Sequence, residues 1–141
     1  MIINMKLILF LIAIVFSSNL SNGQGLNSEA IYIKDNFPEE YENTLKRYAL
    51  FEWKDDFSMV VYEINRQAES IVELVDSFDS DNTNIVYNAI QEWSRSGYLS
   101  KNIKIFSEMT DFSVKYLIKM HCDWSMVKYE YDRQVEAKNS F

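Results

Sequence analysis

The stretch from Asp56 to Glu69 reads DFSMVVYEINRQAE, and the stretch from Asp123 to Glu136 reads DWSMVKYEYDRQVE. The second stretch follows the first at a shift of 67 residues, and nine of the fourteen aligned positions are identical. A helical heptad would repeat only the apolar positions, whereas here serine, glutamate, arginine and glutamine match as well. The sequence therefore predicts an internal duplication, with one copy over about residues 28–78 and the other over about 83–139.

Apolar residues around both copies repeat every seven positions, as they do in helices that pack side by side. The register runs through Leu50, Phe57, Ile64, Ile71 and Phe78 in one copy and through Leu117, Trp124 and Tyr131 in the other. No stretch alternates polar and apolar residues between turn residues, as a half-buried strand would. We therefore expect an all-α fold.

Helix-start and helix-stop residues divide the chain into four predicted helices, two short and two long. The predicted ranges are 28–36, 38–78, 82–95 and a fourth helix that opens at Ser100, Ser107 or Thr110 and ends near Asn139. At ~1.5 Å per residue, a continuous second helix would be about 60 Å long, which exceeds a compact domain of this size. The sequence thus predicts an elongated bundle or a bend near Asp55 and Asp56. The four helices would form one domain, residues 24–141, from two helix pairs about an approximate two-fold axis.

Each copy of the motif carries four polar or aromatic residues at helical spacing. They are Tyr62, Glu63, Arg66 and Gln67 in the first copy and Tyr129, Glu130, Arg133 and Gln134 in the second. Residues three and four apart on a helix are neighbours, so these side chains are expected to bond to one another. The two glutamines also fall on the apolar seam. Either they fix the packing register, or both sets line one polar pocket that recognises a ligand or partner.

The first residues have the order of an export signal. Lys6 precedes an apolar run from Leu7 to Phe16, which a small and polar stretch follows. A run of ten residues is about half of the roughly 20 that a membrane-spanning helix needs. We therefore expect residues 1–23 to be removed, with Ser17 and Gly25 as alternative cleavage positions. The predicted product has no membrane anchor and resides in the periplasm or outside the cell.

Charge and composition restrict the partners of the exported chain. Removing Lys6 reduces the Lys and Arg total from 14 to 13 against 21 Asp and Glu, a net charge of −8. Such a chain repels phosphate backbones, so nucleic acid is not an expected partner. The single cysteine, Cys122, excludes an intrachain disulfide, and its expected place is a buried position on a helix.

Few residues have the chemistry of a catalytic or metal site. His121, Cys122 and Asp123 are adjacent, but successive residues of a helix point about 100° apart and would not meet at one ion. Glu63 and Glu130 would form an acid and base pair only if the two copies faced each other across a cleft. We therefore predict no catalytic activity, metal or cofactor.

The expected function is binding. Nine Tyr and three Trp provide aromatic surface for contact with another protein or with a second copy in a homodimer. The alternative is a carrier that encloses a small apolar or amphipathic ligand in the bundle interior. A filled interior favours the first interpretation, and a lined cavity favours the second.

Overall fold

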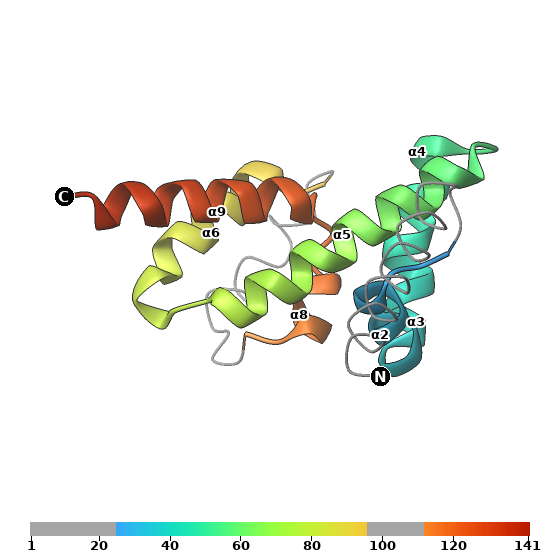
Figure 1. Cartoon of the computed structure of the whole chain (residues 1–141), viewed down its shortest axis with the longest axis horizontal. Coiled ribbons are helices and arrows are strands. Elements are labelled where there is room, and N and C mark those ends of the chain that lie inside the picture. Colours follow the sequence, from blue (N-terminus) through green and yellow to red (C-terminus); the bar gives the residue numbers. More distant parts are fainter. Residues whose placement is uncertain (1–24, 96–111) are drawn as a thin grey trace, which may run out of the picture.

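The computed structural model describes residues 25–95 and 112–141 (Figure 1). In chain order, the elements are α2 (Ser28–Asn36), α3 (Pro38–Glu40), the π-helical turn η1 (Tyr41–Lys46), α4 (Arg47–Trp53), α5 (Phe57–Ser77), the 3₁₀ turn η2 (Ser80–Asn82), α6 (Thr83–Trp93), α8 (Val114–Ile118) and α9 (Trp124–Asn139). The described residues contain no strand, only an isolated bridge between Ser94 and Cys122. The predicted all-α class is confirmed.

Two predictions fall on other parts of the chain. The export signal over residues 1–23 and the alternative helix starts at Ser100, Ser107 and Thr110 lie outside the described residues. Within the described ranges, none of the helices is both long enough and apolar enough to cross a membrane.

Both predicted long helices are interrupted. Residues 38–77 form consecutive helical segments up to Trp53, then a turn, then α5, which is the bend that the length argument allowed near Asp55 and Asp56. The prediction of a continuous fourth helix is wrong, because α8 ends at Ile118 and α9 begins only at Trp124.

One backbone conformation explains both interruptions. Lys54 and His121, which are 67 residues apart, both have a φ angle of 51°, and an α-helix cannot accommodate this value. Two residues later, Asp56 and Asp123 are the N-caps of α5 and α9. Each carboxylate accepts a hydrogen bond from the backbone N–H three residues further on, as N-cap aspartates do. The repeated stretch thus begins at a helix cap and not inside a helix.

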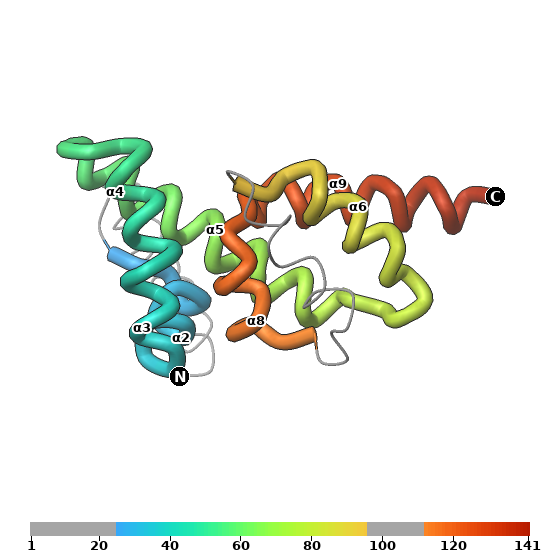
Figure 2. Tube along the Cα trace, turned by 180° about the vertical axis from the view of Figure 1, so that it is seen from behind, coloured from blue at the N-terminus to red at the C-terminus, as the bar shows by residue number. Residues whose placement is uncertain are grey.

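The longest described helix, α5, connects two groups of helices (Figures 1 and 2). One end of α5 lies beside α2 and α4, and its other end packs against α9, which in turn packs against α6. The C-terminal end of α9 extends away from this second group. This arrangement does not confirm the predicted layout of two short and two long helices in one bundle.

The predicted register is buried on both sides of the second interruption, at Leu117, Trp124 and Tyr131, but only after the first one. Ile64, Ile71 and Leu74 on α5 are buried, whereas Leu50 and Phe57 are exposed. The register cannot cross the turn at Lys54, because the helix axis changes direction there. On α9, burial ends at Tyr131, and most of the following residues are exposed. The second half of α9 is therefore a surface feature.

Cys122 occupies the buried position that the sequence predicts, but in a turn and not on a helix. Its thiol is free and close to the carbonyl oxygen of Met120, at a distance of 3.4 Å. Burial raises the pKa of this thiol to about 12, so it stays protonated at neutral pH.

Candidate functional site

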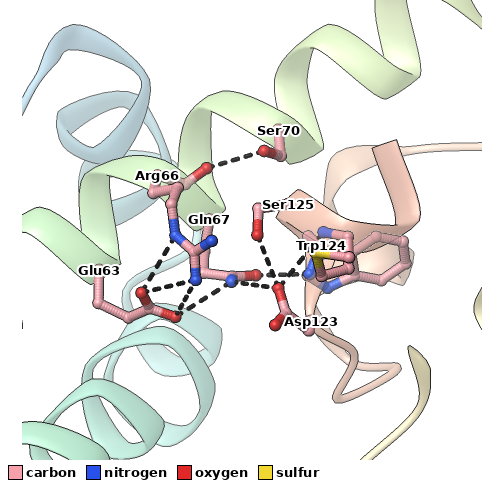
Figure 3. A network of polar contacts seen from close by, with 8 residues as sticks. Glu63, Arg66, Gln67, Ser70, Asp123, Trp124 and Ser125 are labelled. Carbon is pink, nitrogen blue, oxygen red and sulfur yellow. Dashed lines mark hydrogen bonds and ion pairs between the residues drawn. The ribbon is translucent and has the colours of Figure 1, made fainter. Parts of the chain in front are cut away.

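The first motif, defined here as Glu63, Arg66 and Gln67, forms a polar network on α5 (Figure 3). Glu63 and Gln67 are each only 4% exposed. Arg66 donates to both carboxylate oxygens of Glu63, with its shortest contact at 2.9 Å, and the Gln67 amide donates to Oε1 at 3.2 Å. The bonds predicted from the spacing of three and four residues are therefore formed.

Gln67 also joins this network to the second turn, defined here as Asp123, Trp124 and Ser125. Its Nε2 donates to Asp123 Oδ1 at 2.8 Å, and its Oε1 accepts the backbone N–H of Trp124 at 2.6 Å (Figure 3). The first N–H groups of a helix lack partners inside the helix, so Gln67 supplies one of the missing acceptors of α9. A single amide thus fixes the start of α9 on α5.

The charges of this network stabilise one another. Burial by itself would raise the pKa of Asp123, but hydrogen bonds from Gln67 and Ser125 and the charge of Arg66 outweigh it and lower that pKa. Burial would likewise lower the pKa of Arg66, but the Glu63 carboxylate raises it overall. The site therefore holds a fixed cation between two acidic side chains.

The second motif, defined here as Glu130, Arg133 and Gln134, repeats the internal bonds of the first. Arg133 donates to both oxygens of Glu130 at 2.8 to 3.1 Å, and the Gln134 amide donates to Glu130 Oε1 at 3.0 Å. Hydrogen bonds from Arg133, then from Gln134, hold the pKa of Glu130 below its usual value.

The surroundings of the second motif differ from those of the first. Arg133 and Gln134 are exposed, and only 17% of the Glu130 side chain remains accessible. In residues 25–95 and 112–141, the only hydrogen bond to the Gln134 side chain is the one with Glu130. The predicted seam position is therefore wrong for Gln134 and right for Gln67. The reason is that α6 borders this face of α9 only across a hollow, so the Gln134 amide stays exposed.

The structure does not bring the two sets of candidate residues together. Tyr62 and Tyr129 are 56% and 60% exposed, and no hydrogen bond or ion pair among the described residues joins one set to the other. Glu63 and Glu130 are each bound to the arginine of their own motif instead of to each other. The two motifs are separate sites.

Each motif borders its own hollow. A hollow of about 370 Å³ along α5 is lined by residues that include Asn27, Tyr62, Asn65 and Arg66. A smaller one of about 190 Å³ lies between α6 and α9, and its lining consists of Ile85, Asn88, Ala89, Glu92, Glu130 and Gln134. Polar residues outnumber apolar ones in both linings, although apolar atoms form the larger part of the first. The alternative of a carrier for a small apolar or amphipathic ligand is not tested by these hollows and stays a prediction.

Sequence reasoning missed that the second turn completes the first motif. The available signal was that Asp and Ser at the start of each copy match the pattern of an N-cap. The same reasoning placed His121 and Cys122 on a helix, whereas they lie in the turn before α9. There, His121 Nδ1 is hydrogen-bonded to the Tyr48 hydroxyl at 2.8 Å. Among the described residues, no group of three or more His, Cys, Asp or Glu is placed to hold a metal ion.

Comparison of the chain with known protein families, with curated proteins and with solved structures finds no match. A fold class as broad as all-α does not indicate a function by itself. The function is therefore inferred from the two motifs and their surroundings.

Proposed function

We propose that this chain is an exported, non-catalytic helical protein that acts by binding another protein through the exposed face of α9. The observation that carries the proposal is the contrast between the two motifs. The first is completed by a turn from another part of the chain, while the second has Arg133 and Gln134 exposed beside Tyr129. Tyrosine and arginine are, with tryptophan, the residue types most enriched among the strongest contributors to protein interfaces.

The second motif is organised before a partner arrives. Glu130 holds both Arg133 and Gln134 in one conformation by hydrogen bonds. Binding costs less conformational entropy when the contacting side chains are already ordered. The ion pair also occupies the Glu130 carboxylate, which supports a role in recognition over a role as a catalytic base.

We also infer that the two motifs arose from an internal duplication. The nine identical residues support this origin, and so do the equal φ angles at Lys54 and His121 and the matching caps at Asp56 and Asp123. An interaction used once inside the chain would then be available a second time on its surface.

The proposed location is the periplasm or the extracellular space, on the signal-like order of residues 1–23. Fractionation of the native host, followed by N-terminal sequencing, tests it. We expect the protein in the exported fraction with Gln24 as its first residue. Intact Met1 in the cytoplasmic fraction would contradict the proposal.

Crosslinking and affinity capture from the exported fraction test the binding role. The wild-type chain and a matched Glu136→Ala control, altered at another exposed position of α9, should recover the same protein. Gln134→Ala and Tyr129→Ala should lose it, and the loss should persist when the recovered protein is purified and mixed with each variant. Equal recovery by all variants, or no recovery by any, would overturn the role of this face.

A further inference from the structure

The first motif and the second turn show how this protein joins two of its own segments. One glutamine amide both donates to an aspartate carboxylate and accepts the N–H of the next residue, at 2.8 and 2.6 Å. An arginine held by the neighbouring glutamate adds its positive charge beside that carboxylate. The turn thus provides one acceptor, one donor and one negative charge, and the motif provides their complements.

The other half of the duplication contains the same two parts without the contact. The second motif has its internal bonds, yet no turn lies on it among the described residues. The first turn, defined here as Asp56, Phe57 and Ser58, is exposed, with Phe57 at 66%. Its aspartate caps α5 as Asp123 caps α9. The N–H of Phe57, at the first position of α5, has no acceptor within its own helix.

We propose that the second motif binds the first turn of another copy of this chain, an inference that rests on the proposed function. Gln134 of one copy donates to Asp56 of the next copy and accepts the N–H of Phe57. Arg133 lies beside the Asp56 carboxylate, as Arg66 lies beside Asp123. The interaction is therefore the internal contact of the chain, repeated between two molecules.

Charge and space at the second motif fit this occupant. Arg133 is exposed and opposite in charge to Asp56. The hollow of about 190 Å³ next to Gln134 has a mainly polar lining, in which Ile85 and Ala89 are the apolar residues. A cavity of about 150 Å³ holds a benzene molecule, so this hollow is large enough for the Phe57 ring, with Ile85 and Ala89 as its apolar contacts. Glu92, which also lines the hollow, repels the negative turn and weakens the association.

The contact is head to tail, because it joins two different surfaces. Each chain provides one motif and one turn, so association either closes into a ring or continues as a chain of molecules. A matched pair of variants tests the turn and the motif separately. Phe57→Glu damages only the turn, and glutamate is favourable in the first turn of a helix. Gln134→Ala damages only the motif, and alanine preserves the helix.

Sedimentation of the full exported chain over a range of concentrations provides the test. We expect the wild type and the Glu136→Ala control to associate as concentration rises, and each of the two variants to associate at least about tenfold more weakly, a loss of 1.4 kcal/mol. An equimolar mixture of Phe57→Glu and Gln134→Ala should form a one-to-one heterodimer, because it contains one intact motif and one intact turn. Unchanged melting temperatures show that the variants are folded.

A wild-type chain that stays monomeric at the highest concentration overturns this inference. The proposed function survives a monomeric wild type if the chain captures a different protein and Gln134→Ala does not. It fails together with the inference if the wild type captures no protein. Association that Phe57→Glu does not weaken, or a mixture that stays monomeric, also overturns the inference. Exchange of α9 between copies would give association that Phe57→Glu does not weaken, because that exchange uses the contact at Gln67 and not the first turn.

Discussion

The two motifs have the same residues and the same internal bonds, but they lie in different surroundings. Glu63 and Gln67 are buried and receive the start of α9, whereas Arg133 and Gln134 face solvent. A polar cluster at helical spacing therefore forms its local bonds wherever it lies. Whether it also organises the tertiary structure depends on a third segment that reaches it.

The two turns differ in the backbone hydrogen bonds that hold them. In the first, the Asp56 N–H donates to the Trp53 carbonyl at 3.0 Å, so the turn closes on itself. In the second, the Asp123 N–H donates to the Trp93 carbonyl at the end of α6, and the Arg95 N–H donates to the backbone carbonyl of His121 just before the turn. The buried turn is thus held from two sides, by α5 and by the end of α6. Within the described parts of the chain, the exposed turn is held by its own helix cap and closing bond alone.

The largest difference is expected between the two glutamines. Replacing Gln67 with Leu leaves the Trp124 N–H unpaired and should lower the free energy of unfolding by about 2 to 3 kcal/mol. Gln134→Leu should leave it unchanged within error. Because the two side chains do not touch, the double variant should show the sum of the single effects in urea unfolding. A strong coupling between them, or equal single effects, would contradict the separation of the two sites.

The N-cap aspartates should differ by a smaller amount. Asp56→Ala removes an exposed cap and should cost about 1 kcal/mol. Asp123→Ala also removes the acceptor of Gln67, so a cost of about 2 kcal/mol is expected. Thermal unfolding of the two single variants measures the difference. Restoring the cap with Asn should recover more of the loss at position 56 than at 123, and the reverse order would refute the comparison.

The two residues with positive φ should respond to glycine in opposite directions. Lys54 has φ 51° and ψ −109°, the values of the first central residue of a type II′ turn, which glycine prefers. Lys54→Gly should therefore stabilise the protein by up to about 1 kcal/mol. His121→Gly relieves the same φ but loses the bond to Tyr48, so no gain is expected. The melting temperatures decide, and a stabilising His121→Gly would show that the Tyr48 bond contributes little.

The smallest effect expected is on pH dependence, and it comes from His121, two residues before the second turn. Burial, then the charges of Arg47 and Arg95, lower the pKa of His121 below its ordinary 6.5. The unfolded chain then binds more protons as pH falls through 6.5, so stability present above this pH decreases below it. His121→Gln should flatten the free energy of unfolding between about pH 7 and pH 5. Lys54→Gln should not, and an equally steep curve in His121→Gln would assign the decrease to other groups.

Particular residues show which features could be predicted from the sequence and which could not. The spacing of Glu63, Arg66 and Gln67 predicts their bonds, because residues three and four apart are neighbours on any helix. The same spacing does not reveal that Gln67 is covered and Gln134 exposed. The interruptions were harder to read, because Lys54 and His121 are ordinary residues whose positive φ depends on the segments around them.

The sequence by itself determined the helical class and the internal bonds of both motifs, since these depend on residues close together in the chain. Only the tertiary structure decided which of the two polar motifs was buried. Burial depends on contacts between distant segments, here the second turn, 56 residues from Gln67 in the chain. Two nearly identical motifs therefore came to differ in role, one as a tertiary contact and the other as an exposed surface.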